Sequence, residues 1–428
     1  MRVLTLFTFA LTASLAFVHC GGTTSAQPDA GDDDAAIDTG DQADAAIDTA
    51  PDVDNGSPSS TYPAFTIDAP QVENYGGAIL TAPKVVPIYF GNDDTTFTGN
   101  ITSFLNQLAA STYWPAVATE YGVGAITIEP VVQLTDDAPT TIDDTAIRTW
   151  LASEVTDPSW PTADANDPNT IFAIFYPTGT TVTLQGESSC QSFGGYHDAF
   201  PQNSASITYA VVPRCANFNG LVGINAVSGA ASHELIEAST DPHPEQDAAY
   251  AQVDDNHIIF ELVGGGGEVG DMCVSAQNAF YQPTDINADV QRIWSNANAK
   301  AGHNPCVPTN GTPYFNAMPV LADSVTITGL GTTQGVSIPI GQSKTIEVDL
   351  FSDAPTSGPW TVSATDLGGE QQGNTELSFA WDRTTGQNGE KLHLTITAVA
   401  KSQYGAEAFI IDSQLGASHN FWAGIVGN

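Results

Sequence analysis

The sequence predicts two folded domains of different classes, an α+β domain with a mixed sheet followed by an all-β sandwich. In the first, apolar runs of strand length alternate with segments in which apolar residues recur at helical spacing. From about Ala322 onward, short alternating segments are separated by Gly, Asp, Asn and Pro. A chain of 428 residues is long enough to bury a core in each domain. We place the α+β domain at residues 61–318 and the sandwich at residues 319–428.

The N-terminus predicts export. Met1 and Arg2 are followed by an apolar run from Val3 to Val18, which is too short for a spanning helix. Residues 1–19 are therefore predicted to be a signal peptide. Cys20, followed by two glycines, resembles the lipidation site of a bacterial lipoprotein, and plain secretion is the alternative. We expect an extracytoplasmic protein held at the outer membrane or cell surface by a lipid on Cys20.

Residues 20–60 are predicted to be an acidic, disordered tether. Ten aspartates fall between Asp29 and Asp54, where like charges repel and little apolar surface is available for burial. The whole chain has 49 acidic residues against 10 lysines and arginines, a formal net charge of -39. This charge excludes nucleic acid as a favourable partner and favours cations.

The α+β domain is predicted to begin with a strand, a helix and a second strand. Residues 85–90 form an uninterrupted apolar run typical of a buried strand, and residues 125–132 predict the second strand. The intervening helix is indicated by apolar residues at positions i, i+3, i+4 and i+7, namely Ile101, Phe104, Leu105 and Leu108.

A second helix and two further strands follow. The helix begins at Asp143 and Asp144, whose charges favour its positive end. Its apolar face consists of Ile147, Trp150, Leu151 and Val155. Residues 171–176 are uniformly apolar and predict a central strand, and residues 205–212 predict the next one.

The last predicted helix of this domain carries a near-match to the zinc-binding motif H-E-x-x-H. It runs from Asn225 to near Thr240, because Pro242 disfavours helical conformation in the residue before it. His233, Glu234 and Glu237 occupy the motif positions, with Glu237 in place of the second histidine. Residues four apart share one helix face, so His233 and Glu237 are predicted metal ligands and Glu234 the general base. The alternative is that these residues form an ordinary solvated helix face that binds no metal.

The sequence leaves the third metal ligand open. His243 lies ten residues after His233, the spacing found in metzincins, although Thr240 stands where that pattern has glycine. Glu268 and Asp271 are the competing candidates, because they follow a four-glycine run that lets the backbone approach closely. Two histidines and one glutamate favour zinc, whereas a more anionic set makes calcium or a purely structural metal plausible.

Two other features bear on the site. The order of strands and helices up to the motif helix is that of zincin-type catalytic domains. Tyr196 and His197 stand in a glycine-rich passage and could stabilise a developing oxyanion, but we expect a structural role for them.

Six segments of the C-terminal region read as strands of an immunoglobulin-like sandwich: residues 324–327, 345–350, 360–364, 377–381, 392–399 and 408–411. Trp360, Trp381 and Trp422 could form a sugar-binding face, although core tryptophans are the expectation.

Four cysteines beyond Cys20 predict two disulfides in an exported chain. Of three possible connectivities we favour Cys190 with Cys215 and Cys273 with Cys306, because each pair closes a short loop around the candidate site. The chain has no closely spaced C-x-x-C pair, which argues against a cysteine zinc site.

Residues 75 to 310 resemble bacterial relatives of the exordium, or phosphate-induced, protein family. The resemblance rests on Ala82-Pro-Lys-Val-Val-Pro-Ile-Tyr-Phe-Gly91, Gly194-Gly-Tyr-His-Asp198, Tyr209-Ala-Val-Val-Pro-Arg-Cys215, His233-Glu-Leu-Ile-Glu-Ala-Ser-Thr-Asp-Pro242 and Gly267-Glu-Val-Gly-Asp-Met-Cys273. It implies an extracellular protein and no particular activity, since plant members lack the intact H-E pair. The likeness to metallopeptidases is confined to the motif helix.

These observations predict an exported, lipid-anchored, zinc-dependent hydrolase that acts as a metallopeptidase on protein or peptide substrates. The alternative is a non-catalytic cell-surface protein with a structural zinc or calcium site. Carbohydrate binding by the sandwich is a third interpretation. The sequence indicates no oligomeric state.

Overall fold

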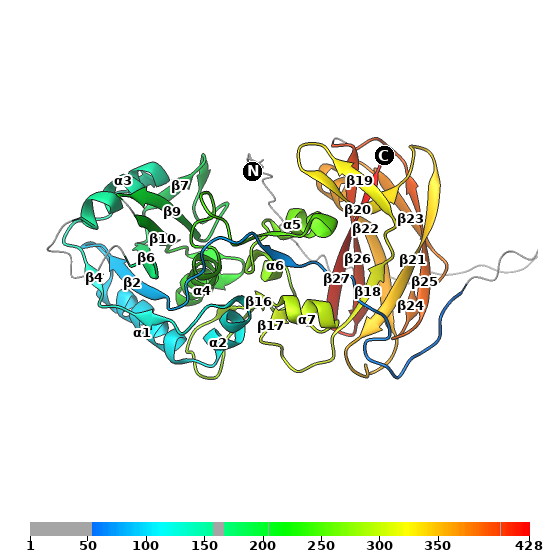
Figure 1. Cartoon of the computed structure of the whole chain (residues 1–428), viewed down its shortest axis with the longest axis horizontal. Coiled ribbons are helices and arrows are strands. Elements are labelled where there is room, and N and C mark those ends of the chain that lie inside the picture. Colours follow the sequence, from blue (N-terminus) through cyan, green and yellow to red (C-terminus); the bar gives the residue numbers. More distant parts are fainter. Residues whose placement is uncertain (1–53, 157–166, 204, 403) are drawn as a thin grey trace, which may run out of the picture. The chain divides into compact units, whose positions relative to one another are not determined.

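The structure is a computed structural model that describes residues 54–156, 167–203, 205–402 and 404–428. The predicted signal peptide, Cys20 and nearly all of the tether lie outside these residues. From Gly56 to the C-terminus the chain forms one compact unit (Figure 1). None of its described helices is long and apolar enough to cross a membrane.

The α+β domain is built on a mixed sheet with the strand order β3-β2-β6-β10-β9. The parallel strands β2 (Lys84–Tyr89), β6 (Thr170–Tyr176) and β10 (Ala205–Pro213) confirm three predicted strands. The antiparallel edge strand β9 (Tyr196–Gln202) was not predicted. The predicted strand at residues 125–132 is divided into β3 (Thr127–Ile128) and β4 (Val132–Gln133), because the intervening Pro130 has no N–H to donate to the ladder.

Helices cover both faces of this sheet, as Figure 1 shows for α1 and α3. Alternate residues of β6 point to opposite faces: Ile171, Ala173 and Phe175 pack in the core with α1 and α4, and Phe172, Ile174 and Tyr176 pack with α3. The helix α1 (Thr95–Ala110) buries the four predicted apolar residues, and Asp94 caps it. The helix α3 (Asp144–Glu154) is capped by Asp143, one residue before its first turn.

The helix α4 (Ile224–Thr240) carries the metal-binding motif and matches its predicted bounds closely. It packs against β10 and β9 on one side and against the short strand β15 (Val290–Gln291) on another. Most of its side chains are therefore buried, including Glu234 and Glu237. Small residues make this packing possible; a Cβ on Gly229 would lie 2.7 Å from Leu221.

The segments after α4 complete the domain with short elements and two disulfides. They include α5 (Ile258–Gly264), α6 (Asp271–Val274), β16 (Ile293–Trp294) and β17 (Cys306–Val307). The disulfides join Cys190 to Cys215 and Cys273 to Cys306, so the predicted connectivity is confirmed.

The C-terminal region is a β-sandwich of two sheets, with strand orders β18-β21-β25-β23 and β19-β20-β27-β26-β22-β24. The six predicted strands are present as β19 (Asp323–Ile327), β21 (Ser343–Ser352), β22 (Trp360–Asp366), β23 (Leu377–Trp381), β25 (Lys391–Ala398) and β26 (Ala406–Leu415). The unpredicted strands are β18 (Phe315–Pro319), β20 (Gly331–Ser337), β24 (Thr385–Gly386) and β27 (Ser418–Gly427).

Two sequence-based expectations about the sandwich need adjustment. It begins at Phe315, four residues before the predicted boundary, because β18 pairs with β21. Trp360 and Trp422 are buried in separate parts of the core, so the three tryptophans do not form the sugar-binding face that was considered.

Candidate metal centre

Metal-binding side chains from three parts of the chain meet beside α4. His197 comes from β9; His233, Glu234 and Glu237 come from α4. Glu268 comes from the glycine-rich loop before α6, and Asp271 is the first residue of α6. Two groups among the described residues have ligand atoms within 4.8 Å of one another. One comprises His233, Glu237 and Asp271, which we call the outer triad. The other comprises His197, Glu234 and Glu237, which we call the inner triad.

The outer triad is set up by the helical repeat of α4. His233 Nε2 lies 2.9 Å from Glu237 Oε2, one turn later on the same face. Asp271 Oδ1 lies 3.6 Å from His233 Nε2. The side chains of His233 and Asp271 are 15% and 23% exposed, whereas that of Glu237 is 3% exposed, so water reaches this triad from one side.

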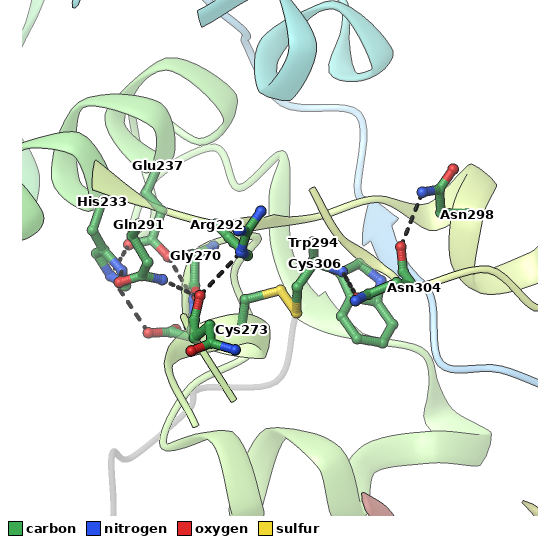
Figure 2. Close-up of a disulfide and its surroundings, with 12 residues drawn as sticks. His233, Glu237, Gly270, Cys273, Gln291, Arg292, Trp294, Asn298, Asn304 and Cys306 are labelled. Atoms are coloured by element: carbon green, nitrogen blue, oxygen red, sulfur yellow. Dashed lines mark hydrogen bonds and ion pairs between the residues drawn. A yellow bond between two sulfur atoms is a disulfide. The ribbon is translucent and has the colours of Figure 1, made fainter. Parts of the chain in front are cut away.

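The loop that supplies Asp271 is fixed by backbone contacts and a disulfide (Figure 2). The N–H groups of Gly270 and Asp271 donate to Glu237 Oε1 at 3.0 and 3.1 Å. The Cys273–Cys306 disulfide ties the first turn after this loop to β17. Glu237 therefore keeps one oxygen on the backbone and presents the other, Oε2, to the triads.

Gln291 determines which nitrogen of His233 faces the carboxylates. The Gly270 carbonyl can only accept, so it takes a hydrogen bond from Gln291 Nε2 at 2.6 Å. Gln291 Oε1 is left to accept from His233 Nδ1 at 3.0 Å. A neutral His233 then directs the lone pair of Nε2 at Glu237 Oε2, 2.9 Å away, which is unfavourable unless the two atoms share a proton or bind the same metal ion. This is the orientation of a metal-binding histidine with its supporting hydrogen bond.

His197 reaches the cluster through the alternation of β9. Tyr196 points to the α3 face, where its hydroxyl donates to Asp144 Oδ1 at 2.8 Å. Its neighbour therefore points to the other face, against α4. His197 Nε2 lies 3.2 Å from the carbonyl oxygen of Asp241, which can only accept. Nδ1 then faces Glu234 Oε2 at 3.5 Å and Glu237 Oε2 at 3.8 Å, longer than normal hydrogen bonds.

The cluster holds an excess of buried negative charge. Along the described chain, no lysine or arginine forms an ion pair with its carboxylates: Glu234, Glu237, Glu268 and Asp271. Burial raises the pKa of Asp271 to about 7, and it raises the pKa of Glu268 well above its ordinary value. Burial alone would lower the pKa of His233 and His197, but the surrounding carboxylates raise both well above the ordinary value. Such a site takes up positive charge, whether protons or a metal ion.

Two glycines leave room for the carboxylates. A Cβ on Gly270 would lie 2.7 Å from both Glu237 Oε1 and His233 Nδ1, and one on Gly195 would lie 2.8 Å from Glu234 Cγ. Contacts this short are excluded, so the close approach of both loops to α4 requires glycine.

Five of the six predicted site residues meet at this cluster: His233, Glu234, Glu237, Glu268 and Asp271. His243 does not, and its candidacy as third ligand is corrected. The helix α4 continues to Thr240 instead of making the turn that glycine would allow, and His243 belongs to neither triad. Its buried Nε2 has no hydrogen-bond partner, and burial lowers its pKa.

Sequence reasoning assigned a structural role to His197, whose side chain is only 4% exposed at the centre of the cluster. The signal that could have identified it is the adjacent glycine pair, which permits close approach to α4, together with strand alternation relative to Tyr196.

Comparison with known proteins gives no functional relative. No family model and no curated protein matches this chain. Among solved structures, domains 4 and 5 of the S-layer protein SbsC match with 19% identity over 26% of this chain and 46% of that chain, at a TM-score of 0.17. The F17R mutant of the titin M10–obscurin-like 1 immunoglobulin complex matches with 16% identity over 27% of this chain and 90% of that chain, at a TM-score of 0.16. The chain thus spans less than half of the S-layer chain it matches. These scores support no argument about function, and the resemblance to the exordium family stays a prediction.

Proposed function

We propose that this chain is an exported metal-dependent hydrolase whose cation is bound by the outer triad of His233, Glu237 and Asp271. The observation that carries the proposal is the orientation of His233, whose Nε2 is directed at Glu237 Oε2 by the hydrogen bond from Nδ1 to Gln291. Imidazole and carboxylate are both zinc ligands, and this set is more anionic than the two histidines and one carboxylate of many catalytic zinc sites. Calcium, which prefers oxygen ligands, is less suited to a site with a histidine at its centre.

The bound cation would polarise a substrate carbonyl and lower the pKa of a nearby water molecule. Glu234 supports the chemistry as the candidate base. It follows His233 directly, and its carboxylate belongs to the cluster without being part of the outer triad. His233, Glu237 and Asp271 would hold the cation, and His197 Nδ1 lies 3.5 Å from the Glu234 carboxylate. Glu268 Oε1 lies 3.4 Å from His197 Nε2 on the other side of that ring.

A peptide is the substrate class we propose. The motif helix lies against a mixed sheet, in keeping with a zincin-like domain. In the described part of that sheet, β9 carries His197 and pairs only with β10. Edge strands of this kind bind extended peptides in other proteins, although here the Ala199 carbonyl already accepts from Arg148 and Gln246.

A second candidate function is a cell-surface protein in which the metal only stabilises the fold. The burial of Glu234 and Glu237, 5% and 2% exposed, favours this alternative because a buried ion is typical of a structural site.

Metal analysis combined with a peptide-library assay separates the two functions. Glu234→Gln should keep the metal of the outer triad and lose roughly a hundredfold or more in activity. His233→Ala should lose that metal. The matched controls Glu245→Gln and His303→Ala change exposed residues away from the cluster and should behave like the wild type. A wild type that holds one equivalent of metal and cleaves nothing would support the structural alternative, and one that holds no metal would contradict both.

Export and anchoring also belong to the proposal. The two disulfides support folding in an oxidising compartment. Residues 1–19 would be removed as a signal peptide and Cys20 would carry the lipid. Cys20→Ser should release the protein from membranes, and a wild type that is already soluble in the medium would contradict the anchor.

A further inference from the structure

We propose that the inner triad of His197, Glu234 and Glu237 binds a second divalent cation, with Glu237 Oε2 shared between the two ions. This inference rests on the proposed metal site of the outer triad. It deepens the proposal, because it assigns a ligand role to His197 and gives the site a capacity for two ions.

The spacing of the ligand atoms is the first argument. The two triads share Glu237, and among the described residues no group within 4.8 Å contains both His197 and His233. Metal–ligand bonds to nitrogen and oxygen are about 2.0–2.2 Å, so opposite ligands of one ion lie at most roughly 4.4 Å apart. A single ion therefore does not bind both imidazoles in this arrangement. Two ions that share one carboxylate can bind both imidazoles, as in two-metal sites whose ions lie about 3.5–4 Å apart.

The orientation of His197 is the second, independent argument. Its side chain is 96% buried, and in the neutral ring the contact of Nε2 with the Asp241 carbonyl leaves the lone pair of Nδ1 directed into the cluster. The nearest atoms there are carboxylate oxygens of Glu234 and Glu237 at 3.5 and 3.8 Å. These separations are too long for good hydrogen bonds but suit two ligands on either side of an ion.

Charge balance is the third argument. When the four carboxylates are ionised and the imidazoles are neutral, the cluster carries four negative charges, and one divalent cation leaves two of them in a largely buried site. A second divalent cation would balance the cluster without help from lysine or arginine. Glu268 Oε1 is buried without a hydrogen-bond partner 3.4 Å from His197 Nε2, so a further carboxylate oxygen lies at this end of the cluster.

The second ion has a functional consequence. Glu234 cannot take a proton from water while it binds a cation, so occupancy of the inner triad should suppress hydrolysis by the outer one. His197, Glu234 and Glu237 are 4%, 6% and 3% exposed at their side chains, and an ion among them should exchange more slowly than one at the partly exposed outer triad. Zinc and manganese, which accept both imidazole and carboxylate, are the cations that suit this set.

Calorimetric titration of the metal-free mature protein with Zn²⁺ tests the inference. The wild type should bind two ions tightly, whereas His197→Ala and the near-isosteric Glu234→Gln should each bind one. His393→Ala removes a histidine paired with Asp382 in the sandwich and should still bind two. The ten aspartates of the tether are common to all variants, so any weak binding to them cancels in the comparison.

The outcomes separate this inference from the proposed function. If the wild type binds only one ion tightly, or if both His197→Ala and Glu234→Gln still bind two, the proposal of a second site is wrong and that of the outer site stands. No tight ion in the wild type would overturn both. X-ray absorption of the doubly loaded protein gives a readout that does not depend on any variant: a zinc–zinc distance of about 3.5–4 Å supports the shared carboxylate, and its absence contradicts it.

Discussion

His233 Nδ1 donates to Gln291 Oε1 at 3.0 Å, and this contact fixes the ring so that Nε2 faces Glu237. The orientation of Gln291 is itself fixed by the carbonyl of Gly270, in the loop that supplies Asp271. The side-chain amide of Gln291 therefore connects the motif helix to the glycine-rich loop, and substitutions on either side of it should change metal binding.

Replacing Gln291 with leucine should weaken zinc binding about 10- to 100-fold, because His233 loses the acceptor that orients it. Competition with a chelator of known affinity gives the dissociation constant. Gln277→Leu is the matched control, since Gln277 bonds to the Ala417 carbonyl away from the cluster. Equal affinities for both variants would show that Gln291 does not orient the ligand.

Gly270→Ala should damage the site for a steric reason. Its Cβ would lie 2.7 Å from Glu237 and His233, so either the loop or the ligands must shift, and we expect a loss of at least tenfold in zinc affinity. Gly99→Ala in α1 is the control, because a Cβ there meets nothing within 4 Å. That substitution should raise the free energy of unfolding by roughly 0.5–1 kcal/mol. If both variants bind zinc like the wild type, the close approach of the loop is not needed.

Removing the Cys273–Cys306 disulfide by a double serine substitution should lower the free energy of unfolding by about 3 kcal/mol, given a sequence separation of 33 residues. It should also weaken metal binding, because Asp271 lies two residues from Cys273. Removal of Cys190–Cys215, with a separation of 25 residues, should destabilise the fold to a similar extent. Removal of Cys190–Cys215 should weaken metal binding by the outer triad less than removal of Cys273–Cys306 does. If it weakens metal binding more, the Cys273–Cys306 disulfide does not hold Asp271 in place.

The stability of the protein should depend on pH through Glu407, which lies in the sandwich far from the metal ligands in sequence. Burial raises its pKa from 4.5 to about 8, and contact with Glu376 adds to the effect. Between these values the folded protein holds a proton that the unfolded chain releases, so stability falls as the pH rises from about 4.5 to 8.

Glu407→Gln has no such proton to lose. The variant and the wild type should have similar melting temperatures near pH 4.5. At pH 8 the variant should be more stable by on the order of 1–2 kcal/mol after allowance for solvent screening. Thermal unfolding across this range measures the difference, with Glu245→Gln as the surface control. Parallel pH profiles for the wild type and Glu407→Gln would refute the shift.

Helical periodicity and strand-length apolar runs made most of the α+β elements predictable. The four apolar residues of α1 and all seven residues of β6 are buried. Because buried positions need apolar side chains, their spacing could be recognised in the sequence. The edge strand β9 was missed because Tyr-His-Asp-Ala-Phe-Pro-Gln mixes polar and apolar residues, as expected for a strand paired on one side only.

The candidate site was predictable only where its residues are close in sequence. His233, Glu234 and Glu237 lie within five residues on one helix, so their relation follows from helix geometry. The choice among His243, Glu268 and Asp271 depends on the paths of the chain after α4 and before α6, which local patterns do not determine. His197 comes from a strand that lies 36 residues before His233 in the sequence, and only the sheet brings the two together.

The most direct test of the central claim is an anomalous difference map, recorded at the zinc absorption edge from crystals of the mature protein grown with Zn²⁺. We expect a peak about 2.0–2.2 Å from His233 Nε2 and from carboxylate oxygens of Glu237 and Asp271. A map with no peak at these three side chains, or with zinc bound only elsewhere, would contradict the metal site on which the proposed hydrolase depends.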